Sequence, residues 1–211
     1  MSNLPDMNLF MLCNKVNKKA FSSLAEGYKI RSLKPSELEE WKALPFDDYY
    51  PEEYKNFMTE YFNRVYLTKE KDFFFRCKVV VDSSDKIVCT CFLWKAYNSV
   101  TTLHWLKTVK SHEGKGLARA LLSHILSNAN EKDFPIILHT QPESFKAIKL
   151  YSDFGFSLLT NKQVGARQNH LKQSLNYLKE NIKNEYFEKL TFIKAPEHLL
   201  ESIPSDKESE F

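Results

Sequence analysis

The sequence predicts an α/β fold in which strands alternate with amphipathic helices. The clearest observation is the stretch 101–126, which reads as a strand, a glycine-containing loop and a helix in succession. Its first nine residues alternate with a period of two, and apolar residues then recur at helical spacing from Leu117 to Ile125. A second strand and helix follow at 134–156, and a hairpin at 73–97 precedes the stretch. These three observations indicate a sheet flanked by helices.

Before that hairpin the sequence predicts one strand and two helices. Residues 28–33 read as the first strand, and Pro45 stops the helix that follows it. A second helix after Pro51 carries an aromatic stripe at helical spacing. The hairpin itself joins strands at 73–82 and 86–97, so antiparallel strands are expected to precede the glycine-containing loop.

Two terminal segments and one insertion lie outside this pattern. Residues 1–27 read as an N-terminal extension that packs on a domain formed by 28–204, and the polar tail at 205–211 is expected to be disordered. If the extension is helical, it carries one apolar stripe, made of Leu9, Leu12, Val16 and Ala20. An amphipathic helix is predicted at 168–183, before a last strand at 187–194. Capping the domain is favoured for this helix over covering a substrate groove or forming a dimer contact.

Composition narrows the classes of function. A chain of 211 residues that is 43% hydrophobic and 27% charged suits one globular domain. The net charge of +3, carried by dispersed lysines, does not predict a nucleic-acid surface. No apolar run has the length of a membrane span, and the N-terminus lacks the pattern of a signal peptide. We therefore expect a cytoplasmic monomer or homodimer that binds neither nucleic acid nor membranes.

The cysteines and histidines do not predict a metal site. The four cysteines include no C-x-x-C pair, and Cys77, Cys89 and Cys91 fall in apolar strand patterns that are typical of reduced, buried thiols. No histidine stands at a recognised ligand spacing from another histidine, a cysteine or a carboxylate. We expect neither a metal nor a disulfide framework.

The loop at 113–118, Glu-Gly-Lys-Gly-Leu-Ala, is the strongest functional signal. Its glycines remove the Cβ atoms that would keep a ligand off the backbone, and the start of the following helix offers free amide N–H groups to an anion. Nucleotide, dinucleotide and coenzyme A sites all use this geometry. The sequence contains no G-x-x-x-x-G-K-[ST] run, and Arg119 stands where a G-x-G-x-x-G pattern needs its third glycine. A tight turn that merely needs glycine is the alternative.

The loop and the later helix together match two signatures of one family. The loop signature Q/R-x-x-G-x-G/A is matched by Glu113, Gly116 and Ala118. The helix signature N-x-x-A-x-x-x-Y-x-x-x-G-F is matched by Ser144, Ala147, Tyr151, Gly155 and Phe156. Over about residues 29–160 the chain therefore resembles the GNAT superfamily of acyl-CoA N-acyltransferases. Glu113 departs from the usual Gln or Arg, and Ser144 departs from the usual Asn but is still expected to cap the helix.

The resemblance implies a fold and a co-substrate. The fold is a mixed, mostly antiparallel central sheet of about seven strands flanked by helices, with an extra amphipathic helix before the last strand. The co-substrate is acetyl-CoA, and no metal is required. The residues implied to bind it are Thr108, Val109, Glu113, Gly114, Lys115, Gly116, Leu117, Ala118, Arg119, Ser144 and Tyr151. In this fold the pantetheine arm pairs with a strand edge, here at 103–109, where that strand splays from its neighbour at 134–140.

Two further expectations concern charge and the acetyl group. A backbone N–H near Thr108 is implied to polarise the acetyl oxygen. Glu113 brings a carboxylate close to the diphosphate, and Lys110 and Lys115 are expected to offset that repulsion. An acidic cluster at 47–53 either supports the start of a helix, which we favour, or attracts a cationic amine.

The resemblance implies acetyl transfer to a primary amine by direct attack in a ternary complex. Tyr151 is the expected acid, because a phenol with a pKa of about 10 is protonated at neutral pH and donates to a departing thiolate. A core tyrosine is the alternative. His104 is a candidate base and His139 a weaker one, although strand histidines are more often satisfied within the core.

The acceptor cannot be read from the sequence. Small amines and peptides both fit, because acceptor-binding residues in this fold come from variable loops. A non-catalytic acyl-CoA-binding or sensing domain on the same scaffold is the alternative function. A pure interaction protein would leave the glycine-containing loop unexplained.

Overall fold

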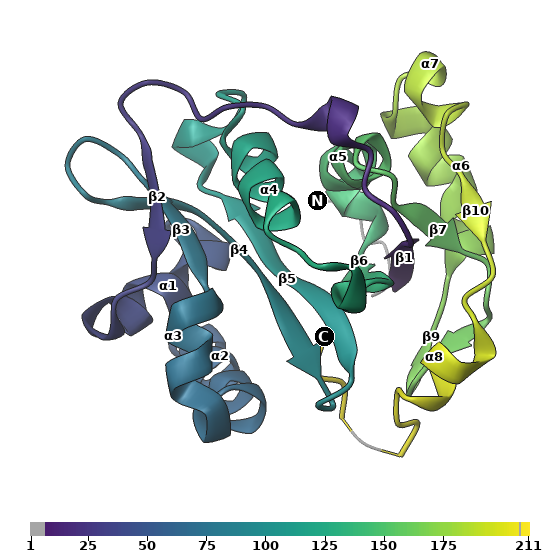
Figure 1. Cartoon of the computed structure of the whole chain (residues 1–211), viewed down its shortest axis with the longest axis horizontal. Helices are drawn as coiled ribbons and strands as arrows, with labels where there is room; N and C mark the ends of the chain where they lie inside the picture. The colour runs from purple at the N-terminus through teal and green to yellow at the C-terminus, as the bar shows by residue number, and fades with distance from the viewer. Residues whose placement is uncertain (1–6, 207) are drawn as a thin grey trace.

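The computed structural model describes residues 7–206 and 208–211. Its strands are β1 Leu9–Cys13, β2 Lys29–Ser32, β3 Lys78–Val81, β4 Ile87–Ala96, β5 Val100–Thr108, β6 Ile136–Thr140, β7 Ser157–Leu159, β8 Gln163–Val164, β9 Arg167–Gln168 and β10 Phe192–Ile193. Eight of them form one sheet in the order β10-β7-β1-β6-β5-β4-β3-β2, and β8 pairs with β9 (Figure 1). The predicted mixed, mostly antiparallel sheet is confirmed, with parallel pairing only at β5–β6 and β10–β7 among the described residues.

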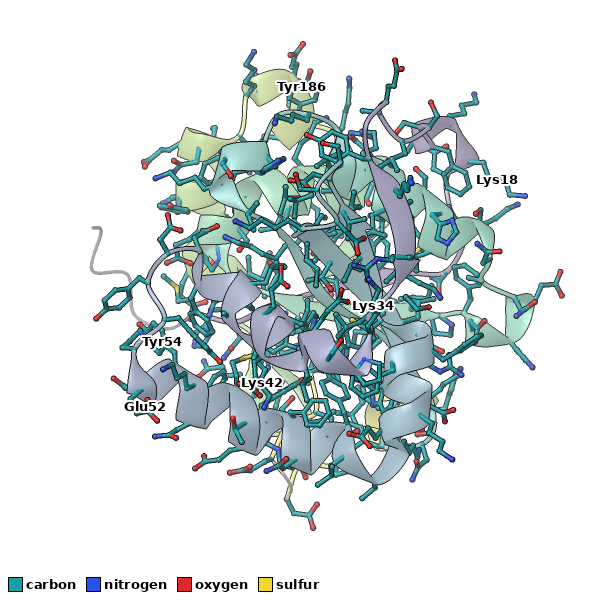
Figure 2. The ribbon with its side chains drawn as sticks, turned by 90° about the vertical axis from the view of Figure 1, so that its left-hand side faces the viewer. Lys18, Lys34, Lys42, Glu52, Tyr54 and Tyr186 are labelled. Carbon is teal, nitrogen blue, oxygen red and sulfur yellow. The ribbon has the colours of Figure 1, made fainter. Side chains whose placement is uncertain are left out.

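The helices cover both faces of the main sheet. They are α1 Leu38–Ala43, α2 Glu52–Val65, α3 Glu70–Arg76, α4 Leu117–Ser127, α5 Phe145–Asp153, α6 Leu171–Asn181, α7 Asn184–Phe187 and α8 Glu197–Glu201. The first three and α8 share one hydrophobic core with the sheet, whereas α4 to α7 share a second core on the opposite face. Figure 2 shows α1 and α2 side by side, with Glu52 and Tyr54 at the N-terminal end of α2.

The helices form where apolar side chains recur at helical spacing. On α2 the buried residues are Met58, Tyr61, Phe62 and Val65, and two glutamates occupy its first turn, where they favour the helix dipole. On α4 nearly every apolar side chain is buried, so this helix packs closely on β4 and β3. The helices predicted after Pro51 and over 168–183 are confirmed as α2 and α6.

The N-terminal segment differs from the predicted extension. It contributes β1, which lies between β6 and β7 and pairs antiparallel with both, and all five of its residues are buried. In Figure 1 the purple chain then crosses the top of the molecule to β2. The conditional helix with an apolar stripe from Leu9 to Ala20 is wrong. A strand with both faces covered reads as an unbroken apolar run and so lacks the alternation that would have identified it. Residues 1–6 of the extension lie outside the described residues.

Two predicted strand boundaries are also wrong. Residues 73–76 belong to α3 instead of a strand, because Phe73 is fully buried against the helical layer and Glu70 and Asp72 favour a helix start. The last strand is only Phe192–Ile193, since the residues before it form α7 and a turn. Short apolar runs are ambiguous between helix and strand, and tertiary packing decides them.

The tail is not free. Of the predicted disordered tail at 205–211, residues 208–211 dock on the domain, and Lys207 lies outside the described residues. Phe211 is 8% exposed and packs its ring against Phe10 and Tyr97. Phe211, Glu208 and Glu210 therefore make specific contacts with the domain, which the polar composition of the tail did not indicate. Among the described residues, no helix is both long enough and apolar enough to cross a membrane.

Candidate active site

The site begins where two parallel strands separate. β5 and β6 pair only at Thr101 with Ile136 and at Thr102 with Ile137, and beyond these pairs the two strands diverge. On its other edge β5 pairs with β4, and the register shifts between Thr90 and Phe92. The shift is a β-bulge at Trp105, whose φ of 51° lies in the left-handed region. A positive φ in a bulky residue stores backbone strain and occurs most often beside functional sites.

Beyond the bulge, the end of β5 borders the gap that opens where β5 and β6 diverge. The Val109 N–H donates to the Val88 carbonyl on the β4 side, at 3.0 Å. Because successive backbone groups of a strand alternate in direction, the Thr108 N–H points to the opposite edge, where β6 has separated. The predicted splay is therefore present, and a free strand edge lies along it.

The glycine-containing loop forms an open cradle at the start of α4. Gly114 and Gly116 have φ values of +77° and +75°, and a Cβ added at either position would meet no atom within 4 Å. Both glycines are therefore required by backbone conformation, and the space beside them is empty. Within the described part of the chain, the amides of residues 114–119 find no acceptor. They are free to bind an anion at the helix N-terminus.

A groove of about 620 Å³ runs from this cradle along β5 to α5. Eight of the predicted coenzyme A residues line it: Thr108, Glu113, Gly114, Gly116, Leu117, Ala118, Arg119 and Ser144. Three do not, since Val109 pairs with β4, Lys115 reaches the Tyr28 hydroxyl at 3.2 Å, and Tyr151 lines a neighbouring cavity. We call this groove the donor groove.

Charges in the donor groove differ from the expected pairing. Glu113 pairs with Lys146 on α5 at 3.0 Å, whereas the Lys110 backbone N–H donates to Asp47. Lys146, which was not expected to pair with Glu113, therefore offsets its charge directly. Arg119 also lines the groove, but its guanidinium is bonded to Asp153 at 2.5 Å and ties α4 to α5. The carboxylate in the loop is thus partly neutralised before any ligand binds.

A second cavity, of about 500 Å³, adjoins the donor groove. We call it the acceptor cavity. Both cavities are lined by Leu106 on β5 and by Ser144 and Ala147 at the start of α5. Ser144 is the N-cap of α5, but its hydroxyl makes no capping bond, so its expected capping role is wrong. The shared residues place the ends of the two cavities next to each other.

Tyr151 lies in the acceptor cavity, one helical turn after Ala147. Its side chain is 6% exposed, and its ring packs against Phe156. Burial raises the pKa of the Tyr151 hydroxyl above its usual range, so the group keeps its proton. No hydrogen bond of the Tyr151 hydroxyl to another described residue is found, so the hydroxyl is available to a ligand in the cavity.

His104 also borders the acceptor cavity, but both of its ring nitrogens are engaged. Its Nδ1 lies 2.6 Å from the Tyr66 hydroxyl, and its Nε2 lies 2.7 Å from Thr102 Oγ1. Trp105 Nε1 donates to the Tyr66 hydroxyl at 3.1 Å, so we assign Tyr66 as the donor to Nδ1. Burial lowers the pKa of His104 to about 3. In this structure His104 holds the bulge of β5 in place, and its role as a base stays a prediction.

His139 lines the same cavity, and one of its ring nitrogens is engaged. Its Nε2 lies 2.8 Å from Asn8 Oδ1, and its ring packs on Phe10. Burial lowers its pKa to about 3, with a smaller contribution from the charge of Arg167. Like His104, it is a neutral imidazole at physiological pH.

Several residues of the acceptor cavity were not predicted. They are Phe46, Phe57, Tyr61, Trp105, Arg167 and Phe211. These come from the α1–α2 connection, α2, the bulge, β9 and the tail, and no local motif links them. The resemblance implied that the first two helices and their connection form one wall of the acceptor site, but it did not identify Phe46, Phe57 or Tyr61 as the residues that do so.

The acidic residues before α2 serve two structural roles. Glu52 and Glu53 occupy its first turn, as favoured. Asp47 instead lies 2.6 Å from Lys107 on β5 and accepts from the Lys110 N–H at 2.9 Å. The Lys107 ammonium and these hydrogen bonds hold the pKa of Asp47 below its usual value, against the effect of burial. Asp47 therefore fastens the α1–α2 connection to the strand that borders both cavities.

The thiols are buried and unreactive. All four cysteines are free, and burial raises the pKa of Cys77 and of Cys89 to about 12. Such thiols stay protonated and are poor nucleophiles. Within residues 7–206 and 208–211, no group of three or more metal-ligating side chains is present.

Comparison with known proteins agrees with this geometry. The model of the acetyltransferase (GNAT) family matches residues 36–156. A GNAT-family acetyltransferase from Colwellia psychrerythraea superposes with a TM-score of 0.51 at 15% identity, over 72% of this chain and 53% of its own. A GCN5-related N-acetyltransferase from Sphaerobacter thermophilus has a TM-score of 0.47 at 15% identity, over 65% of this chain. The present chain spans only 43% of that protein's length.

A further solved structure is Arabidopsis thaliana Naa50 in complex with the bisubstrate analogue CoA-Ac-MVNAL. Its TM-score is 0.43 at 21% identity, over 61% of this chain and 82% of its own. No curated protein matches the sequence. Because the family model covers more than half of the residues, the chain belongs to the GNAT family of acetyltransferases, and its domain is an acyltransferase of the GNAT type.

Proposed function

We propose that this protein is an N-acetyltransferase that transfers the acetyl group of acetyl-CoA to a primary amine by direct attack in a ternary complex. The observation that carries the proposal is the meeting of the donor groove and the acceptor cavity at Leu106, Ser144 and Ala147, beside the Tyr151 hydroxyl. Two substrates bound in adjoining cavities can react without a covalent enzyme intermediate. The buried, protonated cysteines provide no nucleophile for the other route.

The donor groove offers partners for the diphosphate, the pantetheine arm and the acetyl group of acetyl-CoA. The free amides at 114–119 fit the diphosphate, and the open space beside the glycines lets it approach the backbone. The unpaired edge of β5 fits the amides of the pantetheine arm. The Thr108 N–H points into this gap and is placed to donate to the acetyl oxygen, where negative charge develops as the amine attacks.

Tyr151 is proposed as the acid. A new C–N bond forms between the amine and the acetyl carbon while the C–S bond breaks, and the electron pair leaves on sulfur. The protonated Tyr151 hydroxyl donates its proton to that sulfur. The amine nitrogen becomes positively charged as the C–N bond forms, and it then releases one proton. Both ring nitrogens of His104 are engaged, and burial lowers the pKa of His104 and of His139 to about 3, so we propose that this proton leaves mainly through water.

The test is thiol release from acetyl-CoA with a panel of small amines and short peptides. Tyr151→Phe is expected to lower kcat by roughly 10²-fold, the usual contribution of general acid–base catalysis, with the acetyl-CoA dissociation constant unchanged within about twofold. Tyr177→Phe on α6, outside both cavities, is the matched control and should keep full activity. Equal loss in both variants, or none in either, contradicts the role of Tyr151.

The second candidate function is a non-catalytic acyl-CoA-binding or sensing domain. It is favoured by one observation, namely that neither histidine of the acceptor cavity is a strong base, because both ring nitrogens of His104 are hydrogen-bonded and burial lowers the pKa of His104 and of His139 to about 3. Calorimetry separates the two functions. Acetyl-CoA binding without thiol release for any amine of the panel supports the sensor, whereas release above background supports the enzyme. The cytoplasmic location and the monomeric or dimeric state remain predictions.

A further inference from the structure

Residues 208–211 occupy a groove whose anchors come from distant parts of the chain. The Tyr61 hydroxyl on α2 donates to the carbonyl oxygen of Glu210 at 2.6 Å. At the β4–β5 turn, the Tyr97 N–H donates to the Glu210 carboxylate at 2.7 Å, and the Glu210 N–H donates to the Tyr97 hydroxyl at 3.0 Å. Glu210 is thus held through its N–H, its carbonyl and its carboxylate.

Two arginines extend the groove on either side. Arg64 pairs with the Glu208 carboxylate and donates to the Ser209 carbonyl at 3.3 Å. Arg167 on β9 donates to the Phe211 carbonyl oxygen at 2.5 Å. Backbone groups of three consecutive residues and two carboxylates are therefore recognised together, which is how a protein binds a peptide.

The Phe211 ring completes the contact and reaches the acceptor cavity. It lies 6.5 Å from the Phe10 ring and 6.3 Å from the Tyr97 ring, both in edge-on geometry. The same side chain lines the acceptor cavity together with Tyr151 and Trp105. Phe211 is therefore one wall of the cavity in which the acceptor would bind.

This wall differs from the others in its attachment. Residues 208–211 belong to no helix or strand, so each of their contacts can be released without breaking the sheet. Arg167 is partly buried, and among the described residues no Asp or Glu carboxylate pairs with its guanidinium, which donates to Phe211 instead. A partly buried guanidinium of this kind can donate to a carbonyl or to an anion of a bound peptide.

We propose that the groove formed by Tyr61, Arg64, Tyr97 and Arg167 is a binding site for an acidic peptide with an aromatic residue, and that the chain's own residues 208–211 fill it. Filling the groove places Phe211 against the acceptor cavity and narrows that cavity. Emptying it removes this wall and admits bulkier acceptors, a consequence that rests on the proposed acetyltransferase function.

The binding site is tested without any enzymatic readout. The chain lacking residues 208–211 is titrated with the tetrapeptide Glu-Ser-Glu-Phe by calorimetry and by tryptophan fluorescence, since Trp105 lines the cavity. The expected dissociation constant is below about 1 mM. A tethered segment has an effective concentration in the millimolar range, and it stays bound only if its dissociation constant is lower than that concentration. The full chain should bind the same peptide at least tenfold more weakly.

The control peptide Gln-Ser-Gln-Ala lacks the carboxylates and the ring and should bind the shortened chain at least tenfold more weakly. If the shortened chain is folded by circular dichroism and binds neither peptide, or both equally, the proposal fails. In the amine panel, the shortened chain should gain activity with bulky amines relative to small ones. Peptide binding without acetyl transfer by either chain leaves the groove established and overturns the proposed function instead.

A second experiment keeps the chain at full length. A Glu-specific protease is used to cut after Glu208 and Glu210, which are held in the groove. Arg167→Met should speed this cleavage severalfold, because the anchor of Phe211 is lost, whereas Arg76→Met on the surface of α3 should not. Equal cleavage rates in both variants and in the parent chain would show that these residues are not docked.

Discussion

The donor groove and the acceptor cavity are built in opposite ways. The donor groove consists mainly of consecutive residues, a strand end, a glycine-containing loop and a helix start, and its ligand-facing groups are backbone amides. The acceptor cavity is assembled from side chains of α2, β5, β6, α5, β9 and the tail. A site made of backbone is fixed by local conformation, whereas a site made of side chains changes whenever one distant segment changes. The first suits a constant co-substrate, and the second suits a variable one.

The sharpest test of the backbone-built site is Gly116→Val. A β-branched residue at φ +75° costs about 1–2 kcal/mol of strain, and its side chain fills the cradle. We expect acetyl-CoA affinity to fall roughly 100-fold, because the side chain occupies the space that the diphosphate needs and displaces the amides of the loop. Gly27→Val carries the same strain at φ +82° with open space around it and lies outside both cavities. Similar affinity losses in the two variants would show that strain alone, and not the cradle, is responsible.

Two buried histidines of the acceptor cavity should make the stability of the folded protein sensitive to acid. The pKa values of His104 and His139 are about 3 in the folded protein, against about 6.5 in the unfolded chain. Between these values the unfolded chain binds protons that the folded one does not, so stability falls as the pH falls below 6.5. At pH 5 the expected loss is about 2 kcal/mol for each histidine, relative to pH 7.5.

Urea denaturation at the two pH values measures this loss. His104→Asn lacks one of the two titrating groups, so its free energy of unfolding should depend less steeply on pH than that of the parent chain. An unchanged pH dependence would mean that His104 is accessible to protons in the folded state, which is incompatible with its buried position between Tyr66 and Thr102.

The smallest expected effect concerns the carboxylate in the loop. Glu113→Gln should raise acetyl-CoA affinity about two- to fivefold, because it removes a negative charge near the diphosphate and frees Lys146. The gain is small because the two side chains are 45% and 77% exposed and well screened. It should shrink further at high salt. A loss of affinity would instead show that Glu113 positions Lys146 for the ligand.

The sequence predicted the donor groove better than the acceptor cavity, for physical reasons. The loop and the α5 signature are local, so eight of the predicted coenzyme A residues converge on one groove. β1 was missed because a strand covered on both faces shows no alternation. Lys146 was missed as the partner of Glu113 because their pairing depends on how α5 lies beside the loop. Arg167 and Phe211 lack any local signal, since only the closed fold brings them to the cavity.

The position of β1 has a consequence for how the chain folds during synthesis. β1 is the first strand made, yet its partners are β6 and β7, which leave the ribosome much later. Until they appear, its five apolar residues have no sheet to enter, and long-range pairing of this kind is slow and exposed to aggregation. By contrast, β3, β4 and β5 are consecutive antiparallel strands, so each can pair as soon as the next one has been synthesised. We therefore expect β1 to enter the sheet late, at the position where it joins β6 to β7.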